Sequence, residues 1–599
     1  MGKKEVQYSV WSQYQYMYKE LWRYDRKGVC MLLLEVVANV LTPLAAAWLP
    51  AFMVGILEKG SDFKELILSC VVVYVGVILL YSGTTVLGSR NGLLYMFMRL
   101  KRLVLKMLDK STKMNYSQYE QESAQNEMQK CRNALESNAG PGGFYENNKA
   151  LLTGVLGFII YSIMIARLHI LIVLVLLAMS VVQYLSHEVV KRYEANHREQ
   201  QAVHNRVQEY LFNQATDIKS GKDVRMYQLQ KWFISLYDKE NKAYQKQFTK
   251  NECLCFISDC VGLILAFLRD AVAYGYLIYL LMQGMNISEF VLYLGVIAGY
   301  GNWFNQISNV LSQISRCFVG VSDYRRFVEE EEDYQQGEKE LESKEEALDI
   351  LFEDVCFQYP GSNCMVLENI SFHIRKGEKI ALVGLNGAGK TTLVKLLCGF
   401  YSPTKGRILI NGIDITNLNR EKYMERIAVL FQDSILLPYT VAQNVTGQTD
   451  EEMDREKLWQ ALEQSGLADK IKTLPQKENS FIGKHLEEDG IQLSGGQIQK
   501  LFLARALYKE SQMLILDEPT AALDALAESA MYEQYANLVE GKTSVYISHR
   551  LSSTRFCDRI FFLKEGKIIE DGSHTELMEQ NGDYAEMFRV QSQYYKEDM

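Results

Sequence analysis

The sequence predicts two domains of different fold class, an α-helical domain that crosses a membrane several times and an α/β domain that follows it. Three observations support this prediction. The chain has 599 residues, which is too long for one compact core. Its apolar residues are concentrated before about position 315. Beyond about position 350, an apolar strand leads directly into a glycine-rich turn and a helix, an arrangement typical of α/β domains.

The first 27 residues are polar, aromatic and basic, and they lack the short apolar stretch and cleavage site of a signal peptide. We therefore expect them to remain on the mature protein. The large side chains that recur at about helical spacing among the basic residues are Trp11, Tyr14, Tyr18, Leu21 and Trp22. This pattern favours a helix that lies in the membrane interface within the region 1–27.

A helix needs about 20 mostly apolar residues to cross a bilayer. Six stretches of the chain meet or nearly meet this requirement, at about 28–57, 65–88, 150–167, 168–187, 256–282 and 289–314. We expect tight turns at 167–169, between the third and fourth spans, and at 283–286, between the fifth and sixth. The sixth span is the least apolar, because Asn302, Asn305 and Gln306 lie in its second half.

The charge of the loops predicts the orientation of the spans. Lysine and arginine are abundant between the second and third spans and between the fourth and fifth, and they are rare in the alternate loops. By the positive-inside rule, the basic loops and both termini are cytoplasmic. We expect the helices to extend into the cytoplasm and to turn there near 116–123 and 216–223. Residues 140–143, Gly-Pro-Gly-Gly, should interrupt a helix below the third span. The transmembrane domain is thus predicted to cover 28–328, followed by an acidic linker at 329–349.

Three ionisable residues fall inside predicted spans. Glu35 lies in the first span, and Arg269 and Asp270 are adjacent in the fifth. Ionisable residues are costly in a membrane and usually have a function there. One interpretation is ion pairing between helices, with Glu35 and Arg269 as a candidate pair. The other is a polar spot in a substrate cavity.

The strand expected at 378–383 runs directly into the sequence G-x-x-x-x-G-K-T, which precedes a helix expected at 392–398. In such a loop the glycines let backbone N–H groups surround the phosphates of a nucleotide, and the helix N-terminus adds its dipole. Lys390 is expected to reach the β- and γ-phosphates of ATP, and the Thr391 hydroxyl to bind Mg²⁺. The expected ATP-binding residues of this loop are Gly384, Asn386, Gly387, Ala388, Gly389, Lys390, Thr391 and Thr392.

A second motif begins at Met513, where four apolar residues are followed by two carboxylates. The apolar run predicts a parallel strand that is covered on both faces. Asp517, at the C-terminal end of this strand, is placed to bind Mg²⁺, and Glu518 is placed to orient or deprotonate the attacking water. A surface strand end is the alternative, and the phosphate loop elsewhere in the chain disfavours it.

Residues 493–497, Leu-Ser-Gly-Gly-Gln, precede a helix expected at 498–508. The backbone amides at the start of that helix are expected to be free, which makes an anion site. This segment matches the signature sequence of ATP-binding cassette (ABC) transporters, and the chain resembles an ABC exporter half-transporter over essentially its whole length. The resemblance implies ATP contacts from Ser494, Gly495, Gly496 and Gln497.

The same resemblance implies roles for four further positions, which occur in the family's order. Tyr359 looks like the aromatic residue that stacks on adenine, and Gln432 looks like the glutamine that contacts Mg²⁺ and senses the membrane domain. Asp524, in a segment similar to the family's D-loop, would lie at the dimer interface. His549 looks like the switch histidine that contacts the γ-phosphate. The implied catalytic residues are Glu518, His549 and Gln432, and the implied Mg²⁺ ligands are Thr391, Gln432 and Asp517.

The resemblance implies an α-helical polytopic membrane domain of six transmembrane helices joined to an α/β P-loop ATPase cassette over 350–599. Two such halves would form a dimer, with each ATP between Lys390 of one cassette and Ser494 of the other. A homodimer is favoured because the chain has an intact set of ATPase motifs, and a heterodimer with a related half-transporter is the alternative. An ATP-gated regulator or channel on the same scaffold is disfavoured by the intact Glu518 and His549.

The implied activity is ATP-driven export of an amphipathic substrate, which could be a drug, a lipid or a peptide. A net charge of -9 argues against a nucleic-acid partner. The sequence shows no organelle-targeting signal, which favours a bacterial cytoplasmic membrane, with membrane lipid as the surrounding partner.

Overall fold

The structure, a computed structural model, describes residues 8–60, 63–138, 140–217, 220–330, 337–342, 346–484, 487–517, 541–548 and 551–596. The chain divides into two compact units. The first consists of Met1–Lys113 and Gln125–Glu330, and the second of Met114–Ala124 and Glu331–Met599. The short segment Met114–Ala124 therefore belongs to the second unit, although the chain enters it from the first unit and returns to the first unit after it.

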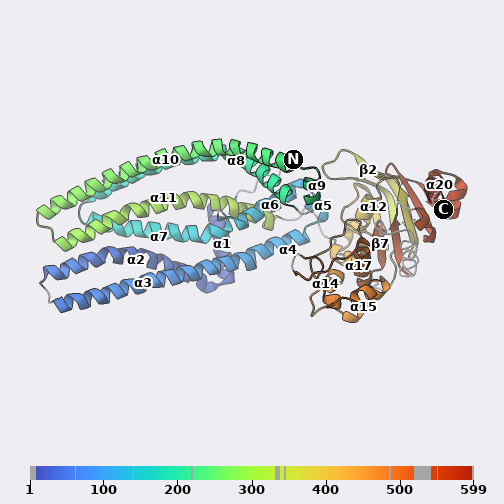
Figure 1. Cartoon of the computed structure of the whole chain (residues 1–599), viewed down its shortest axis with the longest axis horizontal. Coiled ribbons are helices and arrows are strands. Elements are labelled where there is room, and N and C mark those ends of the chain that lie inside the picture. The colour runs from blue at the N-terminus through green and yellow to red at the C-terminus, as the bar shows by residue number, and fades with distance from the viewer. Residues whose placement is uncertain are drawn as a thin grey trace. The chain divides into compact units, whose positions relative to one another are not determined.

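The first unit is built from helices (Figure 1). Its long helices are α2 (Arg26–Glu58), α3 (Phe63–Met98), α7 (Pro141–Ala166), α8 (Ile170–Thr216), α10 (Gln230–Met282) and α11 (Ile287–Glu329). Shorter elements are α1 (Val10–Tyr24), a π-helical turn at Arg99–Val104, α4 (Leu105–Lys113), α6 (Glu122–Glu136) and α9 (Gly221–Met226). The helix α5 (Tyr116–Tyr119) lies in the segment that belongs to the second unit.

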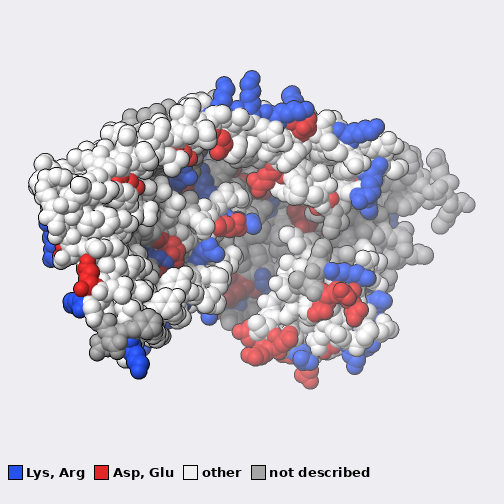
Figure 2. Space-filling view, turned by 60° about the vertical axis from the view of Figure 1, so that its left-hand side comes forward, with Lys and Arg blue, Asp and Glu red and all other residues white. Residues whose placement is uncertain are grey.

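Among the described residues, four helical segments are long and apolar enough to cross a membrane. They are Arg26–Glu58, Leu66–Lys113, Pro141–Ala166 and Gln230–Met282, and α8 adds a shorter apolar part at Ile170–Met179. The most apolar part of the second segment contains no buried residue. Figure 2 shows broad areas without charged side chains on the surface, as contact with lipid requires. The chain is a multi-pass membrane protein. That it crosses the membrane six times stays a prediction.

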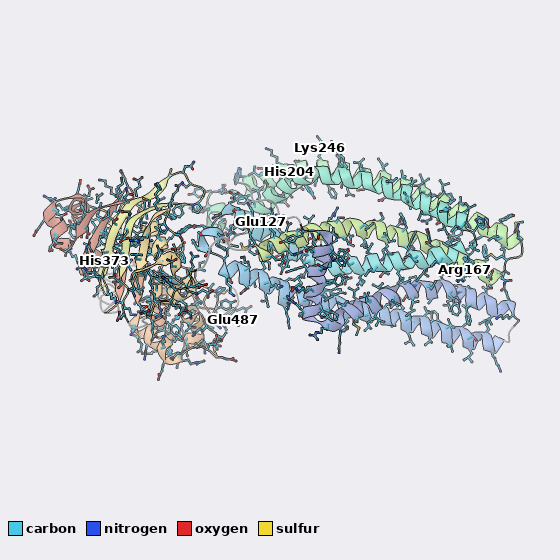
Figure 3. The ribbon with its side chains drawn as sticks, turned by 180° about the vertical axis from the view of Figure 1, so that it is seen from behind. Glu127, Arg167, His204, Lys246, His373 and Glu487 are labelled. Atoms are coloured by element: carbon cyan, nitrogen blue, oxygen red, sulfur yellow. The ribbon has the colours of Figure 1, made fainter. Side chains whose placement is uncertain are left out.

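The turns expected between the paired helices are confirmed. Residues 167–169 separate α7 from α8, and the His169 side chain accepts a hydrogen bond from the Leu171 backbone N–H (3.2 Å). Arg167, labelled in Figure 3, lies in this turn at one end of the helices. Residues 283–286 separate α10 from α11 in the same way.

The interruption expected at 140–143 is confirmed as well. α6 ends at Glu136, and α7 begins at Pro141, which has no N–H to donate and therefore suits the first position of a helix. Gly140 caps this helix, and a Cβ there would lie 2.1 Å from the carbonyl oxygen of Ala134. Only glycine fits between the end of α6 and the start of α7, so this residue fixes where α7 begins.

The helices α8 and α10 are much longer than a membrane span. α10 has 53 residues and α8 has 47. At about 1.5 Å per residue, α10 is about 80 Å long, more than twice the hydrocarbon thickness of about 30 Å. The two helices pack together, and the His204 Nδ1 of α8 lies 2.8 Å from the Glu240 carboxylate of α10 (Figure 3). A large part of each helix therefore extends beyond a bilayer.

The expected ion pair between Glu35 and Arg269 is wrong. Glu35 on α2 is buried, lies 2.8 Å from the Lys149 Nζ on α7, and accepts a hydrogen bond (2.6 Å) from the Asn91 side chain on α3. Arg269 on α10 pairs instead with its neighbour Asp270 (2.8 Å). The reason is packing, because α2 packs on α3, α7 and α11, whereas α10 packs mainly on α8.

The helix α1 has two different sides. Met17 is fully buried, and Tyr14 packs edge-on against Phe144 of α7, with ring centroids 5.4 Å apart. Trp11 and Trp22 are 70% and 51% exposed. The aromatic residues expected at the membrane interface are thus divided between the interior of the helical unit and its surface.

The second unit contains two β-sheets. A four-stranded antiparallel sheet has the order β2-β1-β4-β5, and a six-stranded sheet has the order β10-β9-β3-β8-β7-β6, parallel except for β10. The strands expected at 378–383 and from Met513 are confirmed as β3 and β7. The strands are β1 (Ile350–Gln358), β2 (Met365–Ile374), β3 (Lys379–Gly384), β4 (Lys405–Ile410), β5 (Ile413–Asp414), β6 (Ile427–Leu430), β7 (Met513–Asp517), β8 (Thr543–Ile547), β9 (Arg559–Lys564) and β10 (Lys567–Gly572).

Helices cover both faces of the six-stranded sheet. On β3, Ile380 and Leu382 pack in one core with α12, whereas Ala381 and Val383 pack in another core with α17. A third core joins α17 to α14, α15 and α16. The main helices of this unit are α12 (Lys390–Leu397), α13 (Arg420–Glu425), α14 (Val441–Thr446), α15 (Arg455–Gln464), α16 (Ala468–Lys472), α17 (Gly495–Tyr508), α19 (His574–Gln580) and α20 (Asp583–Lys596).

Candidate ATP-binding site

Four neighbouring parallel strands, β3, β8, β7 and β6, end at the same edge of the six-stranded sheet. The register aligns Leu382 of β3 with Ile547 of β8, and Ile547 with Asp517 of β7. β6 is aligned with β7 in the same direction, and Gln432 follows it by two residues. The predicted phosphate loop, Gln432 and Asp517 therefore lie at one edge, which is where ligands bind in open parallel sheets.

The predicted phosphate loop connects β3 to α12. Gly384, Gly387 and Gly389 have φ values of +152°, +81° and +106°, which other residues rarely adopt. A Cβ on Gly384 would lie 2.2 Å from the carbonyl oxygen of Leu563, and one on Gly389 would lie 2.6 Å from the Leu367 side chain. A Cβ on Gly387 would meet no atom within 4 Å. The two ends of the loop thus lie against β9 of the six-stranded sheet and β2 of the four-stranded sheet, and its middle faces open space.

The Lys390 side chain lies within this loop. It is buried, and its ammonium donates hydrogen bonds to the carbonyl oxygens of Gly384 (2.8 Å) and Leu385 (3.1 Å). Thr391 beside it is exposed. Lys390 is also the first residue of α12, where the helix dipole favours an anion. A cation and a helix N-terminus therefore meet at the loop, as binding of a phosphate requires.

The ring of Tyr359 is held from three directions. Its hydroxyl lies 3.0 Å from the Thr392 Oγ1 on α12. Its plane is nearly perpendicular to the rings of Phe357 and Tyr401, with centroids 5.0 and 5.4 Å away. These contacts fix the half-buried ring beside the helix that follows the phosphate loop. The predicted ATP contact of Thr392 stays a prediction, and its buried side chain serves Tyr359 in this structure.

Oxygen atoms at the sheet edge can hold a hard cation. Asp517, the last residue of β7, is 4% exposed, and Gln432 is exposed. Together with the Thr391 hydroxyl they offer a carboxylate, an amide and a hydroxyl oxygen, the kinds of ligand that Mg²⁺ prefers. The chemistry of this donor set fits Mg²⁺.

The predicted signature segment caps α17. The Ser494 Oγ accepts a hydrogen bond from the Gln497 backbone N–H (3.4 Å), and the Gln497 side chain accepts one from the Ser494 backbone N–H (3.0 Å). Because this capping box occupies the Gln497 amide, the expectation of free amides is wrong at that position. Gly495 and Gly496 form the first turn between the two capping residues.

Three predicted site residues, Glu518, Asp524 and His549, lie outside the described residues. Glu518 directly follows Asp517 in the chain. Ser548, which precedes His549, is buried just after the end of β8. The roles of these three residues stay predictions.

Two residues beside Tyr359 were missed by sequence reasoning. The Lys395 Nζ lies 5.6 Å from the centre of the Tyr359 ring, and Tyr401 packs on the same ring. No motif marks them, because Lys395 is one of several polar residues of a helix and Tyr401 lies in the loop after it.

The second unit contains an ABC transporter domain, since residues 367–521 match the family described as "ABC transporter". The chain is 42% identical over 246 residues to the ATP-dependent lipid A-core flippase of Burkholderia orbicola (strain AU 1054), covering 41% of this chain and 40% of that protein. It is 32% identical over 369 residues to the subtilin transport ATP-binding protein SpaT of Bacillus subtilis, covering 60% of this chain and 58% of that protein. The matches thus span about two-fifths to three-fifths of the length of these curated relatives.

The whole chain is similar in fold to a solved exporter. The structure of a bacterial Atm1-family ABC exporter with ATP bound aligns with a TM-score of 0.77, covering 94% of this chain and 98% of that one, at 22% sequence identity. At this identity the likeness shows the fold. The family match adds an ATP-binding ABC domain in the C-terminal part. The chain therefore has the fold of an ABC exporter, in which an N-terminal helical transmembrane domain is joined to a C-terminal ABC transporter domain.

Proposed function

We propose that the protein is an ATP-driven exporter that moves an amphipathic substrate out of the cytoplasm or the inner leaflet. One observation carries this proposal, which is the convergence of the phosphate loop, Gln432 and Asp517 at one edge of the parallel sheet. The ATPase domain that contains this edge is covalently joined to helices that are apolar enough to cross a membrane. ATP hydrolysis at the sheet edge would supply the energy for transport.

The residues of the sheet edge have separate roles in hydrolysis. The Lys390 ammonium and the loop amides hold the β- and γ-phosphates. Thr391, Gln432 and Asp517 hold Mg²⁺, which neutralises phosphate charge when it is bound. Phosphoryl transfer to water depends mostly on such positioning and on charge stabilisation, because there is little covalent chemistry for the protein to perform.

The remaining predicted residues contact the attacking water, the γ-phosphate and the adenine ring of ATP. Glu518 orients or deprotonates the attacking water, and His549 contacts the γ-phosphate. Tyr359 stacks on adenine, a role supported by the contacts that fix its ring beside α12.

A second copy of the chain completes the site. Ser494 caps α17, which packs on the opposite face of the six-stranded sheet from α12, the helix that follows the phosphate loop. We infer that Ser494, Gly495 and Gly496 of one copy contact the ATP held by the other copy, with Asp524 at the dimer interface. A homodimer is supported by the intact set of motifs in this one chain.

The substrate and the membrane are inferred from the relatives. Their names refer to lipid A-core and to subtilin transport, which supports a lipid or a peptide as the amphipathic substrate. They come from bacteria, which supports a bacterial cytoplasmic membrane, with both termini in the cytoplasm.

The test is ATP hydrolysis by the purified protein in lipid nanodiscs, measured with a panel of lipids, peptides and drugs. We expect one compound class to stimulate hydrolysis, and we expect Glu518→Gln to lower the rate roughly 100-fold or more while ATP binding is kept. Wild-type turnover in Glu518→Gln would contradict the catalytic assignment. A folded, ATP-binding protein without hydrolysis would contradict the homodimer and favour a heterodimer or an ATP-gated regulator.

A further inference from the structure

The segment Met114–Ala124 lies in the first half of the chain but packs as part of the ATPase unit. Tyr116 stacks on Phe400, with ring centroids 4.7 Å apart and planes 25° from parallel. Arg420 donates a hydrogen bond to the Asn115 side chain. An aromatic stack and a polar contact therefore hold this segment on the surface of the cassette.

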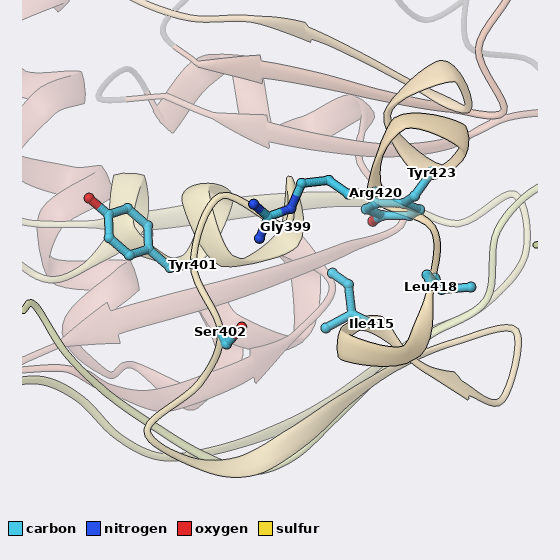
Figure 4. Close-up of a pocket in the computed structure, with 7 residues that line it drawn as sticks. All are labelled: Gly399, Tyr401, Ser402, Ile415, Leu418, Arg420 and Tyr423. Carbon is cyan, nitrogen blue, oxygen red and sulfur yellow. The ribbon is translucent and has the colours of Figure 1, made fainter. Parts of the chain in front are cut away.

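Glu120 is the charged residue of this contact. One of its carboxylate oxygens lies 3.1 Å from the Lys395 Nζ, and the other accepts a hydrogen bond from the Tyr401 hydroxyl. Figure 4 shows Tyr401 and Arg420, two of the cassette residues that bond to the segment, among the side chains that line one small pocket. The segment thus contacts residues that already lie close together in the cassette.

The contact between Glu120 and Lys395 is an ion pair. Burial raises the pKa of the Glu120 carboxyl, but hydrogen bonds from Tyr401 and Lys395 outweigh it and lower this pKa overall. Burial lowers the pKa of the Lys395 ammonium, but the hydrogen bond to Glu120 and the electrostatic interactions with Glu120, Tyr359 and Tyr116 together raise this pKa overall. Both groups are therefore charged at neutral pH.

Lys395 and Tyr401 also contact the residue that is proposed to stack on adenine. The Tyr401 ring lies at 89° to the Tyr359 ring, with centroids 5.4 Å apart, and the Lys395 Nζ lies 5.6 Å from the centre of the Tyr359 ring. Lys395 also belongs to α12, which begins with Lys390. One lysine therefore contacts Glu120 and the proposed adenine-binding ring from the helix that follows the phosphate loop.

We propose that Glu120 is a positioning residue for the adenine site, because it holds Lys395 and the Tyr401 hydroxyl and thereby fixes the orientation of the Tyr359 ring. This inference rests on the proposed function. Without the carboxylate, Lys395 loses its counter-charge and Tyr401 loses its charged acceptor, so both contacts that hold the Tyr359 ring in place become weaker. Because coupling between two sites is reciprocal, adenine binding in turn strengthens the contact of residues 114–124 with the cassette.

The test measures the ATP affinity of Glu120→Gln, both as the Kd in the Glu518→Gln background and as the KM with Glu518 present. We expect both constants to rise about 5-fold, while kcat changes less than about 2-fold. The matched control is Glu122→Gln, because Glu122 is an exposed carboxylate two residues along the chain. This control should keep wild-type affinity. Unchanged affinity in Glu120→Gln, or a loss of kcat alone, would overturn the inference.

Two further measurements separate this role from a folding defect. Exchange of the charges, Glu120→Lys with Lys395→Glu, should recover part of the affinity that each single change loses. ATP should slow the hydrogen exchange of the backbone amides of residues 114–124 in the full-length protein, and Glu120→Gln should remove this effect. Wild-type protein that binds ATP without protecting 114–124 would overturn the inference. Wild-type protein that binds no ATP would instead contradict the proposed function.

Discussion

The ATPase unit and the transmembrane unit hold their buried charges in different ways. In the ATPase unit, Lys390 is bound by the carbonyl oxygens of Gly384 and Leu385, six and five residues earlier in the chain. In the transmembrane unit, Glu35 is bound by Asn91, 56 residues away, and by Lys149 on a third helix. A site within one loop depends on local sequence, whereas a site between helices depends on how those helices pack.

Lys390→Ala tests the local half of this comparison and has the largest expected effect. The change removes the cation that the loop holds at the phosphates, so we expect ATP hydrolysis to fall roughly 1000-fold, the upper range for loss of one charge-stabilising donor. Steady-state ATPase assays in nanodiscs would measure it. The control is Lys376→Ala, which removes an exposed lysine paired with Glu346 and should hydrolyse ATP at the wild-type rate. Activity that survives in Lys390→Ala would show that the motif does not form the site.

Lys149→Met tests the other half of the comparison. The change leaves the buried Glu35 carboxylate without its cation, so we expect the helical unit to lose about 3 kcal/mol of stability, at the low end for a broken buried ion pair. Thermal unfolding in nanodiscs would measure the loss, and ATP affinity should not change.

The double variant Glu35→Gln with Lys149→Met sharpens the result. The glutamine still offers an oxygen to Asn91 and carries no charge, so most of the stability should return. If Lys149→Met is as stable as the wild type, the ion pair contributes nothing to the packing of α2 on α7.

Tyr359→Leu has the smallest expected effect of the three changes. Loss of one stacked base contact is worth about 1–3 kcal/mol, so we expect the KM for ATP to rise about 10-fold with a smaller change in kcat. The control is Tyr439→Leu, a tyrosine that is 48% exposed elsewhere in the cassette. A fall in kcat with an unchanged KM would mean that Tyr359 does not stack on adenine.

The same contrast explains how much could be predicted from the sequence. The strand, loop and helix around Lys390 and the strand that ends in Asp517 could be predicted, because each is a contiguous pattern. The helix ends at 140–143, 167–169 and 283–286 could be predicted too, because turn-forming residues or breaks in the apolar stretches mark them.

Contacts between distant segments could not be predicted. The partner of Glu35 depends on the packing of three helices, and no periodicity in the chain encodes it. The cluster of Glu120, Lys395 and Tyr401 joins segments that lie in different halves of the sequence. The bond between Ser494 and Gln497 is local, and the Ser-x-x-Gln spacing of a capping box could have predicted it, although we expected free amides there.

The capping box at Ser494 satisfies backbone amides at the start of α17 when no ligand is bound. With the Ser494 hydroxyl and the Gln497 side chain bonded to each other's backbone amides, the helix needs no ligand to satisfy them. If a phosphate bound there, as proposed, one acceptor would replace another and the number of hydrogen bonds would change little. The gain would then come from the negative charge of the incoming acceptor. The negative charge would therefore let this helix end distinguish a nucleoside triphosphate from water. The backbone amides could alternate between the capping side chains and the phosphate many times without unfolding of the helix.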